Sequence, residues 1–365
     1  MSGPAIVLAG GGSGGHITPG LALASVLAER GARLLWIGAR GGLESEVVPA
    51  AGIPYEESGM KRVSTGVART VRRLVSALGA VPATRRMLRS FGADAVVGLG
   101  GYASVPVLMA ARLSGVPSYL VEANAIPGAV TRRFAASASA VFSNFACARD
   151  YLPKRVLFHH TGIPIRPELA EKLASRRPPP LGGPERLLVL GGSQGARALN
   201  KAVVGALPSL ELEFPGLSVV HITGRLDYEA LAAFYRSRPN AEVHPFLEDM
   251  TPAYLGSTVA LTRAGAVSLA ELSLAGIPSV VVPLPHSADD HQTANARFYA
   301  ERGAAVLLPQ SKLTPSSLIR EMVELLHDRE KRIAVSTAFR SLARPDAARA
   351  VADLLLDSIA ERRAA

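Results

Sequence analysis

Polar side chains follow a buried stretch in the second half of the chain. Residues 279–284 are apolar and rich in β-branched side chains, as expected for a strand covered on both faces. The segment after them carries imidazole, hydroxyl, carboxylate and amide groups: His286, Ser287, Asp289, Asp290, His291, Gln292 and Asn295. Such groups hydrogen-bond sugar hydroxyls, and ligands of open α/β sheets bind beyond the carboxyl ends of strands. We therefore predict a sugar-binding site here, with a solvated loop as the alternative.

The segment before that strand adds a carboxylate. Residues 266–275 have helical spacing of apolar side chains, and Gly276 and Pro278 end the pattern. Glu271 lies in the first turns of this helix, where it could accept hydrogen bonds from a ribose. The pair Asp289 and Asp290 is the nearest approach to a metal-binding motif, and we interpret it as a loop acid and a helix N-cap. We predict no metal and no cofactor.

Three glycine-rich turns each follow a short apolar strand. They occupy residues 10–15, 98–101 and 191–195. In such turns backbone N–H groups can approach phosphate closely, and the third turn also opens a helix. Gly10, Gly12 and Gly15 formally match G-x-G-x-x-G, but the second strand ends at Arg40 rather than at an acid. An NADP-dependent oxidoreductase is therefore disfavoured and stays an alternative.

The elements that position these turns alternate between strand and helix. At 365 residues the chain suggests two domains, each with a doubly wound parallel sheet. We expect an N-terminal domain at 1–162, a Pro- and Gly-rich linker at 163–184, a C-terminal domain at 185–340, and a helix at 341–365 that is a candidate to pack back on the first domain. In the first helix we expect Thr18 as N-cap and Pro19 at the first position.

Localisation signals are few. The amino terminus has no basic region before its short apolar run, and the long uncharged runs contain Gly and Pro. We therefore expect neither a signal peptide nor a transmembrane helix. The single cysteine, Cys147, excludes an internal disulfide and fits a reducing compartment.

Positive charge is concentrated in the first half of the chain. Residues 1–160 hold 17 Lys and Arg against 8 Asp and Glu, which accounts for +9 of the net charge of +10. Residues 60–91 interleave apolar side chains with the basic residues Lys61, Arg62, Arg69, Arg72, Arg73, Arg85, Arg86 and Arg89. We interpret this surface as a site for anionic lipid headgroups; the alternative is a solvated helix face. Phe91 is the one aromatic residue in it, so we expect no nucleic acid partner.

Several motifs together resemble the MurG family of bacterial peptidoglycan glycosyltransferases. The matching segments are GGGSGGHITPGLALA, GLGGYASVP, GGSQGARALN, PFLEDM, RAGAVSLAELSLAGIPSVVVP and DDHQTANA, in the order of the family. The resemblance implies two Rossmann-like domains facing a cleft, the GT-B architecture. It implies metal-independent, inverting transfer of N-acetylglucosamine from UDP-GlcNAc to the MurNAc of lipid I, which gives lipid II. It places the protein peripherally at the cytoplasmic face of the plasma (inner) membrane, with other cell-wall synthesis proteins as further candidate partners.

The same resemblance assigns residues to the two substrates. For the donor UDP-GlcNAc it implies Ser13, Gly14, Gly15, His16, Asn124, Arg166, Gly192, Ser193, Gln194, Gly195, Phe246, Leu247, Met250, Arg263, Ala266, Glu271, Gln292 and Asn295. Phe246, Leu247 and Met250 match the segment that lines the uracil, and Glu271 matches the acid that holds the ribose. The acceptor pyrophosphate is expected near Gly11, Gly12, Gly100, Gly101 and Tyr102.

The chemistry requires a general base, because a sugar hydroxyl must lose its proton as it attacks the anomeric carbon. We predict His16, since it follows the first glycine turn and a histidine is largely neutral near pH 7. The alternative role for His16 is to cap the loop or to bind pyrophosphate as a cation. Glu122, with Asn124, is the rival base or an acid that orients the acceptor, and Tyr102 is expected to contact a sugar.

Two departures from the family and two further hypotheses stay open. Position 291 is His where many relatives carry a second Gln, and position 123 is Ala where a polar residue is common, which leaves sugar discrimination less defined. A GT-B transferase with a different lipid acceptor, or a membrane-bound protein that binds UDP-sugar without catalysis, would share these motifs. Assays with different lipid acceptors distinguish the other transferase from our interpretation. The turnover of a His16→Ala variant distinguishes the non-catalytic binding protein from an enzyme.

Overall fold

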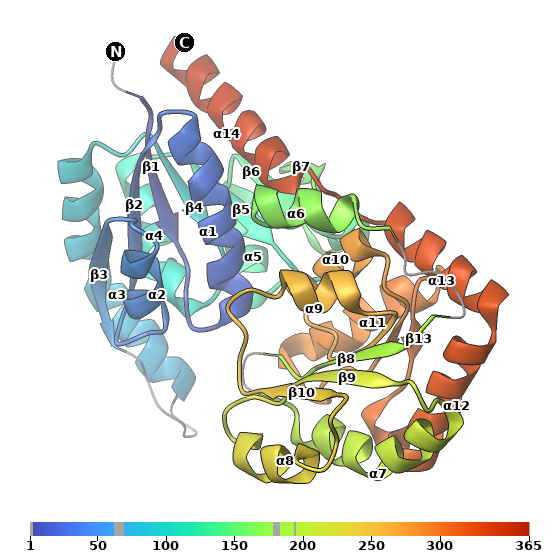
Figure 1. Ribbon diagram of the computed structural model, residues 1–365. Coiled ribbons are helices and arrows are strands. Elements are labelled where there is room, and N and C mark those ends of the chain that lie inside the picture. Colours follow the sequence, from blue (N-terminus) through green and yellow to red (C-terminus); the bar gives the residue numbers. More distant parts are fainter. Residues whose placement is uncertain (1–2, 62–68, 178–182, 193–194, 365) are drawn as a thin grey trace. The chain divides into compact units, whose positions relative to one another are not determined.

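The computed structural model describes residues 3–61, 69–177, 183–192 and 195–364. The chain forms two compact units, Met1–Pro167 with Arg344–Ala365 (unit 1) and Glu168–Ala343 (unit 2). It therefore passes between the units twice, after residue 167 and after residue 343. The segment 163–184, which we predicted to be a linker, contains helix α6 (Pro167–Ala174). Figure 1 shows the elements of both units along the chain.

Among the described residues of unit 1, seven parallel strands form one sheet. Their spatial order is β3 (Tyr55–Lys61), β2 (Arg33–Arg40), β1 (Ala5–Ala9), β4 (Ala95–Gly98), β5 (Ser118–Glu122), β6 (Ala140–Ser143) and β7 (Leu157–His160). The central strand β1 is completely buried, in agreement with its continuous apolar sequence. The order reverses direction between β1 and β4, which is the switch point of a doubly wound fold.

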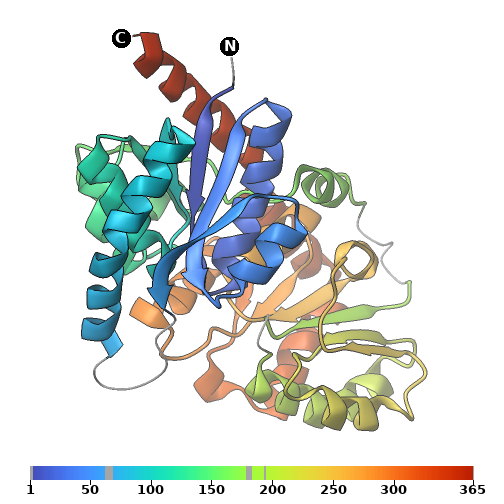
Figure 2. The same cartoon turned by 90° about the vertical axis from the view of Figure 1, so that its left-hand side faces the viewer.

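Helices cover both faces of this sheet. Figure 2 shows α1 (Gly14–Glu29) and α2 (Glu44–Ala50) on one face, and α3 (Arg69–Phe91) and α4 (Val105–Ser114) on the other. Helix α5 is Ala129–Phe134, and the C-terminal helix α14 (Ala347–Ala364) packs on α1. Side chains of α14 are tied to the sheet: the Tyr119 hydroxyl lies 2.7 Å from that of Ser358, and Arg363 pairs with Asp94 at 2.6 Å.

The start of helix α1 differs from our prediction. Thr18 is not the N-cap, because the helix begins at Gly14 with Ser13 as its N-cap and Pro19 lies inside it. Pro19 is the sixth residue of this helix and has no N–H, so one i→i−4 hydrogen bond is missing at this point. The earlier start has a functional consequence: it places His16 in the first turn of α1 instead of in a loop.

Unit 2 repeats the arrangement of unit 1. Within its described part, six parallel strands follow the order β10 (Ala241–His244), β9 (Ser218–Ile222), β8 (Arg186–Leu190), β11 (Val259–Thr262), β12 (Ser279–Val281) and β13 (Val306–Leu307). The remaining helices are α7 (Arg197–Glu213), α8 (Tyr228–Tyr235), α9 (Thr251–Gly256), α10 (Ala266–Ala275), α11 (His291–Ala300), α12 (Pro315–His327) and α13 (Arg329–Ser341). The predicted fold class, two doubly wound parallel sheets, is confirmed.

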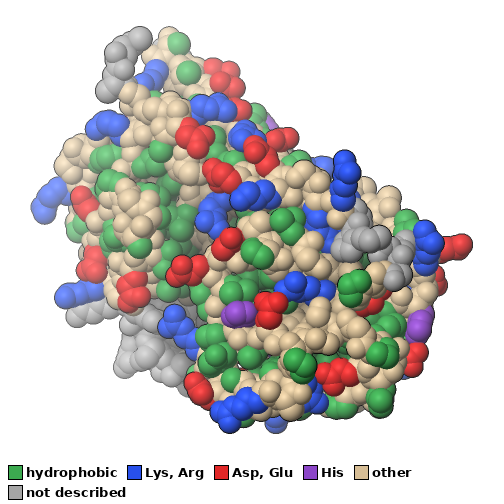
Figure 3. Space-filling model, viewed as in Figure 1, with side chains coloured by type: hydrophobic (Ala, Val, Ile, Leu, Met, Phe, Trp, Pro, Cys, Tyr) green, Lys and Arg blue, Asp and Glu red, His purple; other side chains and the backbone are tan. Residues whose placement is uncertain are grey.

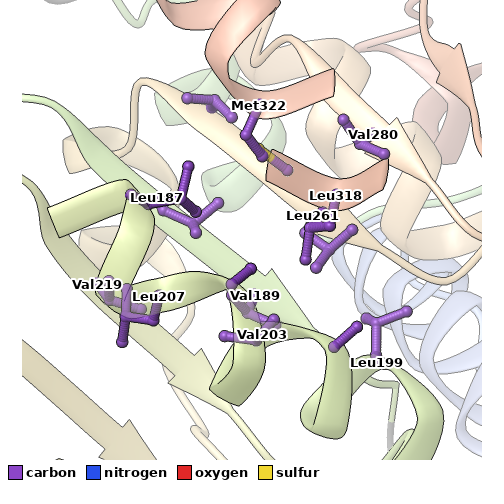
Figure 4. Close-up of a cluster of buried hydrophobic side chains, with 14 of the residues drawn as sticks. Leu187, Val189, Leu199, Val203, Leu207, Val219, Leu261, Val280, Leu318 and Met322 are labelled. Carbon is purple, nitrogen blue, oxygen red and sulfur yellow. The ribbon is translucent and has the colours of Figure 1, made fainter. Parts of the chain in front are cut away.

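The core of unit 2 lies between its sheet and helices α7 and α12. Figure 4 shows Leu187, Val189 and Leu261 on the strands facing Leu199 and Val203 of α7 and Leu318 and Met322 of α12. All of these side chains are at most 2% exposed. Burying each such side chain contributes roughly 1.5–3 kcal/mol, so this layer holds α7, whose N-terminal end follows the third glycine turn.

Candidate functional site

The predicted site residues cluster at the switch point of each sheet. In unit 1 the turn after β1 and the turn after β4 are neighbours because the two strands pair directly. In unit 2 the turn after β8 and the start of α10 are neighbours because β8 pairs with β11. Ligands of doubly wound folds bind at such points, since adjacent loops diverge there. The structure thus brings segments that are far apart in sequence into two local sites, one in each unit.

His16 is held by the first glycine turn. Its Nδ1 atom lies 3.3 Å from the Gly11 carbonyl oxygen and 3.1 Å from the Ser13 hydroxyl, and the ring is half-buried. A carbonyl oxygen can only accept, so this contact favours the tautomer in which Nδ1 carries the proton. Nε2 is then the nitrogen with the lone pair, as a general base requires.

The second glycine turn packs against the His16 ring. A Cβ atom on Gly100 would lie 3.1 Å from His16 Nε2, and one on Gly101 would lie 2.6 Å from the Gly11 oxygen. Both glycines have positive φ, 89° and 72°. Tyr102 follows directly, and its side chain is 44% exposed. The two turns predicted for the acceptor therefore meet around the predicted base.

The Gly12 amide, which we expected to approach pyrophosphate, already has a partner inside the protein. It donates a hydrogen bond to Glu44 Oε2 at 3.0 Å, and Glu44 is 1% exposed. Sequence reasoning did not single out Glu44. The available signal was an acid that begins a helix two residues after the Gly41 and Gly42 pair, a position that can reach back to a neighbouring loop.

Glu122 organises the loop that follows β5. Its Oε1 atom accepts from the backbone N–H of Asn124 at 2.9 Å, and its Oε2 atom accepts from the N–H of Gly128 at 3.0 Å. The side chain is 4% exposed. These contacts favour a role in shaping the acceptor loop around Asn124 over proton transfer, so His16 remains our predicted base.

The third glycine turn closes against the end of β9. Gly192 and Gly195 have positive φ, and a Cβ atom on Gly195 would lie 2.5 Å from the Thr223 carbonyl oxygen. Ser193 and Gln194, predicted for the donor, lie outside the described residues. The turn leads into α7, a helix of 17 residues whose N-terminus favours an anionic ligand.

Helix α10 presents the predicted ribose acid. It begins at Ala266 with Gly265 as N-cap and ends at Gly276 in the left-handed conformation, as predicted. Glu271 Oε2 accepts a hydrogen bond of 2.6 Å from the Tyr254 hydroxyl. Tyr254 is 2% exposed, and its burial, together with the nearby Glu271 charge, raises the pKa of its hydroxyl. The phenol therefore stays protonated and orients the carboxylate.

Three other predicted donor residues hold the loop around this helix. Arg263 is 7% exposed and donates to the carbonyl oxygens of Val282 and Pro283, and burial lowers its pKa. Asn295 is buried and its Nδ2 donates to the Ala264 oxygen at 3.1 Å. Gln292 accepts from the Leu284 N–H at 2.9 Å. In this structure all three side chains position the backbone beside the predicted sugar site.

The polar loop before α11 is strained. His286, Asp289 and Asp290 have φ between 53° and 56°, a conformation that non-glycine residues adopt at a cost of about 1–3 kcal/mol. Asp290 occupies the N-cap position of α11, as we expected, although its Oδ1 atom is bonded to the Thr293 hydroxyl at 2.7 Å. Within the described ranges, no group of three His, Cys, Asp or Glu side chains could hold a metal ion.

The remaining predicted donor residues lie at exposed or half-buried positions. Phe246 follows β10, and 53% of its surface is accessible, which suits stacking on a base. Leu247 and Met250 are half-buried beside it. Arg166 is exposed close to the end of the first stretch of unit 1.

The predicted basic surface is described in part. Lys61 ends strand β3, Arg62 lies outside the described residues, and the side chains of Arg69, Arg72 and Arg73 are likewise not described. On α3, Arg86 and Arg89 are exposed, whereas Arg85 bonds Ser114 and Leu113 at the end of α4. Val75 and Leu78 of the same helix are 63% and 48% exposed. The face drawn in Figure 3 shows basic and acidic side chains interspersed rather than one continuous basic area. No helix in the described part of the chain is long and apolar enough to span a membrane.

Known proteins match both units. Models of the glycosyltransferase family 28 N-terminal and C-terminal domains match residues 6–143 and 186–351. A UDP-N-acetylglucosamine--N-acetylmuramyl-(pentapeptide) pyrophosphoryl-undecaprenol N-acetylglucosamine transferase from Stutzerimonas stutzeri (strain A1501) is 40% identical over 361 residues, covering 96% of this chain and 98% of the relative. A relative with the same name from Methylococcus capsulatus is 40% identical over 354 residues, covering 96% of this chain and 98% of its own.

Solved structures agree with these matches. The crystal structure of Acinetobacter baumannii MurG has a TM-score of 0.77 at 32% identity and covers 96% of this chain and 98% of its own. The calicheamicin glycosyltransferase CalG4 has a TM-score of 0.70 at 18% identity, which shows the shared GT-B fold. Because the similarity extends over nearly the full length of both partners, the chain belongs to glycosyltransferase family 28 and, within it, to the MurG family.

Proposed function

We propose that the protein transfers N-acetylglucosamine from UDP-GlcNAc to the 4-hydroxyl of MurNAc in lipid I, with inversion at the anomeric carbon, and so produces lipid II and UDP. The observation that carries this proposal is the 40% identity to transferases of that name over nearly the whole of both chains. The geometry supports it, because each unit has a glycine turn at its switch point.

Unit 2 would bind the donor. The N-terminus of α7 and the backbone N–H groups of the third glycine turn suit the diphosphate, and Glu271 suits the ribose hydroxyls. Phe246 is an exposed aromatic side chain next to the strand ends, as expected for a residue that contacts uracil. Asn295 and Gln292 would define the sugar site by holding its backbone walls.

Unit 1 would bind the acceptor and supply the base. As the MurNAc oxygen forms a bond to the anomeric carbon, the bond from that carbon to the UDP oxygen breaks, and the hydroxyl proton passes to His16 Nε2. The carbonyl oxygen of Gly11 then stabilises the resulting imidazolium through Nδ1. The negative charge that develops on UDP meets the amides and the helix dipole of α7.

The lipid acceptor requires access to a membrane surface. Val75 and Leu78 would contact the apolar boundary of the bilayer while Arg86 and Arg89 contact anionic headgroups. This arrangement supports the peripheral position at the cytoplasmic face of the plasma membrane that we propose for the protein.

The direct test is transfer of labelled GlcNAc from UDP-GlcNAc to a short-prenyl analogue of lipid I in the presence of EDTA, with UDP release followed in parallel. Formation of a labelled disaccharide lipid would support the assigned donor, the assigned acceptor and a reaction that needs no metal ion. UDP binding without transfer would refute the assignment of lipid I as the acceptor, and other lipids would then be tested. His16→Ala should lower turnover at least about 100-fold and leave UDP affinity unchanged.

A further inference from the structure

Glu44 is a buried carboxylate bonded to the glycine turn that holds His16, and the mechanism above does not use it. It opens helix α2 and is 1% exposed. A Cβ atom on Gly11 would lie 2.1 Å from its carboxyl carbon, one on Gly42 would lie 2.4 Å from it, and one on Gly38 would lie 2.7 Å from its Cγ. Three glycines from different segments thus leave the space that this side chain fills.

Both carboxylate oxygens accept backbone hydrogen bonds. Oε2 accepts from Gly12 N–H at 3.0 Å, and Oε1 accepts from Ala39 N–H at 3.2 Å. Glu44 therefore ties the first glycine turn to the end of strand β2.

The Gly12 N–H belongs to the same peptide group as the Gly11 carbonyl. That carbonyl oxygen faces His16 Nδ1 at 3.3 Å, while the N–H, which points the opposite way in the same peptide plane, faces Glu44. The peptide is trans and planar, so fixing its N–H direction also fixes its carbonyl direction. Hydrogen bonds in such a chain also polarise one another, which strengthens the carbonyl as an acceptor.

We propose that Glu44 is a positioning residue for His16, acting through the Gly11–Gly12 peptide. It holds the carbonyl that fixes the Nδ1-protonated tautomer, and it stabilises the imidazolium that forms when Nε2 takes the acceptor proton. The role corresponds to that of an acid that orients a catalytic histidine, with a peptide group inserted between the two side chains. This inference rests on the proposed function of His16.

The test is Glu44→Gln, with Glu46→Gln as the matched control from an exposed position of the same helix. The glutamine keeps the shape but replaces one acceptor oxygen by an NH2 group that faces a backbone N–H. We expect kcat for GlcNAc transfer to fall about 10- to 100-fold, with the KM for UDP-GlcNAc and the UDP affinity close to wild type. The lost buried hydrogen bond should lower the Tm, so activity is compared at a temperature at which both variants are folded. Glu46→Gln should retain wild-type kcat.

Nitrogen-15 NMR of labelled histidine gives a readout that does not require turnover, with the His16 signals identified by their loss in His16→Gln. The wild type should show protonated Nδ1 and unprotonated Nε2, and Glu44→Gln should shift the population toward the other tautomer.

Four results would overturn the proposal or separate it from the proposed function. An Nε2-protonated wild type, a wild-type kcat for Glu44→Gln, or a loss of kcat in step with UDP affinity would each overturn the role of Glu44. Absence of transfer by the wild type would instead refute the proposed function, while the NMR result would still decide whether Glu44 sets the tautomer.

Discussion

Protonation of the buried His221 should limit the stability of unit 2 in acid. This side chain on β9 is 0% exposed, its Nδ1 lies 2.9 Å from the Tyr235 hydroxyl, and its Nε2 lies 3.0 Å from Asn200 Oδ1. Because the amide oxygen can only accept, Nε2 carries the proton and Nδ1 accepts from Tyr235. The neutral ring is fully satisfied, and burial lowers the pKa of His221 from 6.5 to about 4.

The magnitude follows from the difference in proton binding between the folded and unfolded chains. Between pH 6.5 and pH 4 the unfolded chain takes up a proton that the folded chain excludes, so falling pH favours unfolding. Each unit of pKa difference corresponds to about 1.4 kcal/mol, and the whole window therefore removes about 3 kcal/mol from the free energy of unfolding. Above pH 6.5 the term vanishes, because both states are neutral.

The assay is urea unfolding of the wild type, His221→Gln and Tyr235→Phe between pH 8 and pH 4.5, followed by circular dichroism. Fluorescence is unsuitable, since the single tryptophan, Trp36, lies in unit 1. His221→Gln should be less stable by about 1–3 kcal/mol at pH 8, because it loses buried hydrogen bonds, and its stability should fall less steeply toward pH 4.5. Tyr235→Phe keeps the histidine and should keep the wild-type slope. Parallel curves for the wild type and His221→Gln would refute the reasoning.

Three further predictions concern the sites. Gly101→Ala should reduce kcat at least about 100-fold, because its Cβ would collide with the Gly11 oxygen at a positive φ; a wild-type rate would show that the second turn does not support His16. Tyr254→Phe should weaken UDP binding about 3- to 10-fold in titration calorimetry, since one hydrogen bond that orients Glu271 is lost, and should affect 2′-deoxy-UDP less. Charge reversal at Arg86 and Arg89 should reduce binding to anionic vesicles and leave UDP affinity unchanged; vesicle binding at the wild-type level would place the membrane contact elsewhere.

Local backbone features were predictable from the sequence because they depend on neighbouring residues. The strand–turn–helix units, the N-terminus of α10 and its end at Gly276 follow from apolar spacing and from the conformational preferences of Gly and Pro. The family also followed from motifs spread along the chain. The start of α1 was wrong, because Thr18 and Pro19 form a local start signal and the helix begins earlier, at Gly14.

The tertiary structure decided which side chains act directly and which position the backbone. Glu44 bonds Gly12 from 32 residues away, and Asn295 bonds Ala264 from 31 residues away. Periodicity and turn signals specify the backbone within one element, but such partners meet because strand pairing in a parallel sheet brings distant loops to one edge. The sequence alone therefore determined the fold class, the family and the chemistry to expect. The positions of the acids around His16 and the ribose site depended on the order of the strands, which places loops side by side regardless of their separation in the chain.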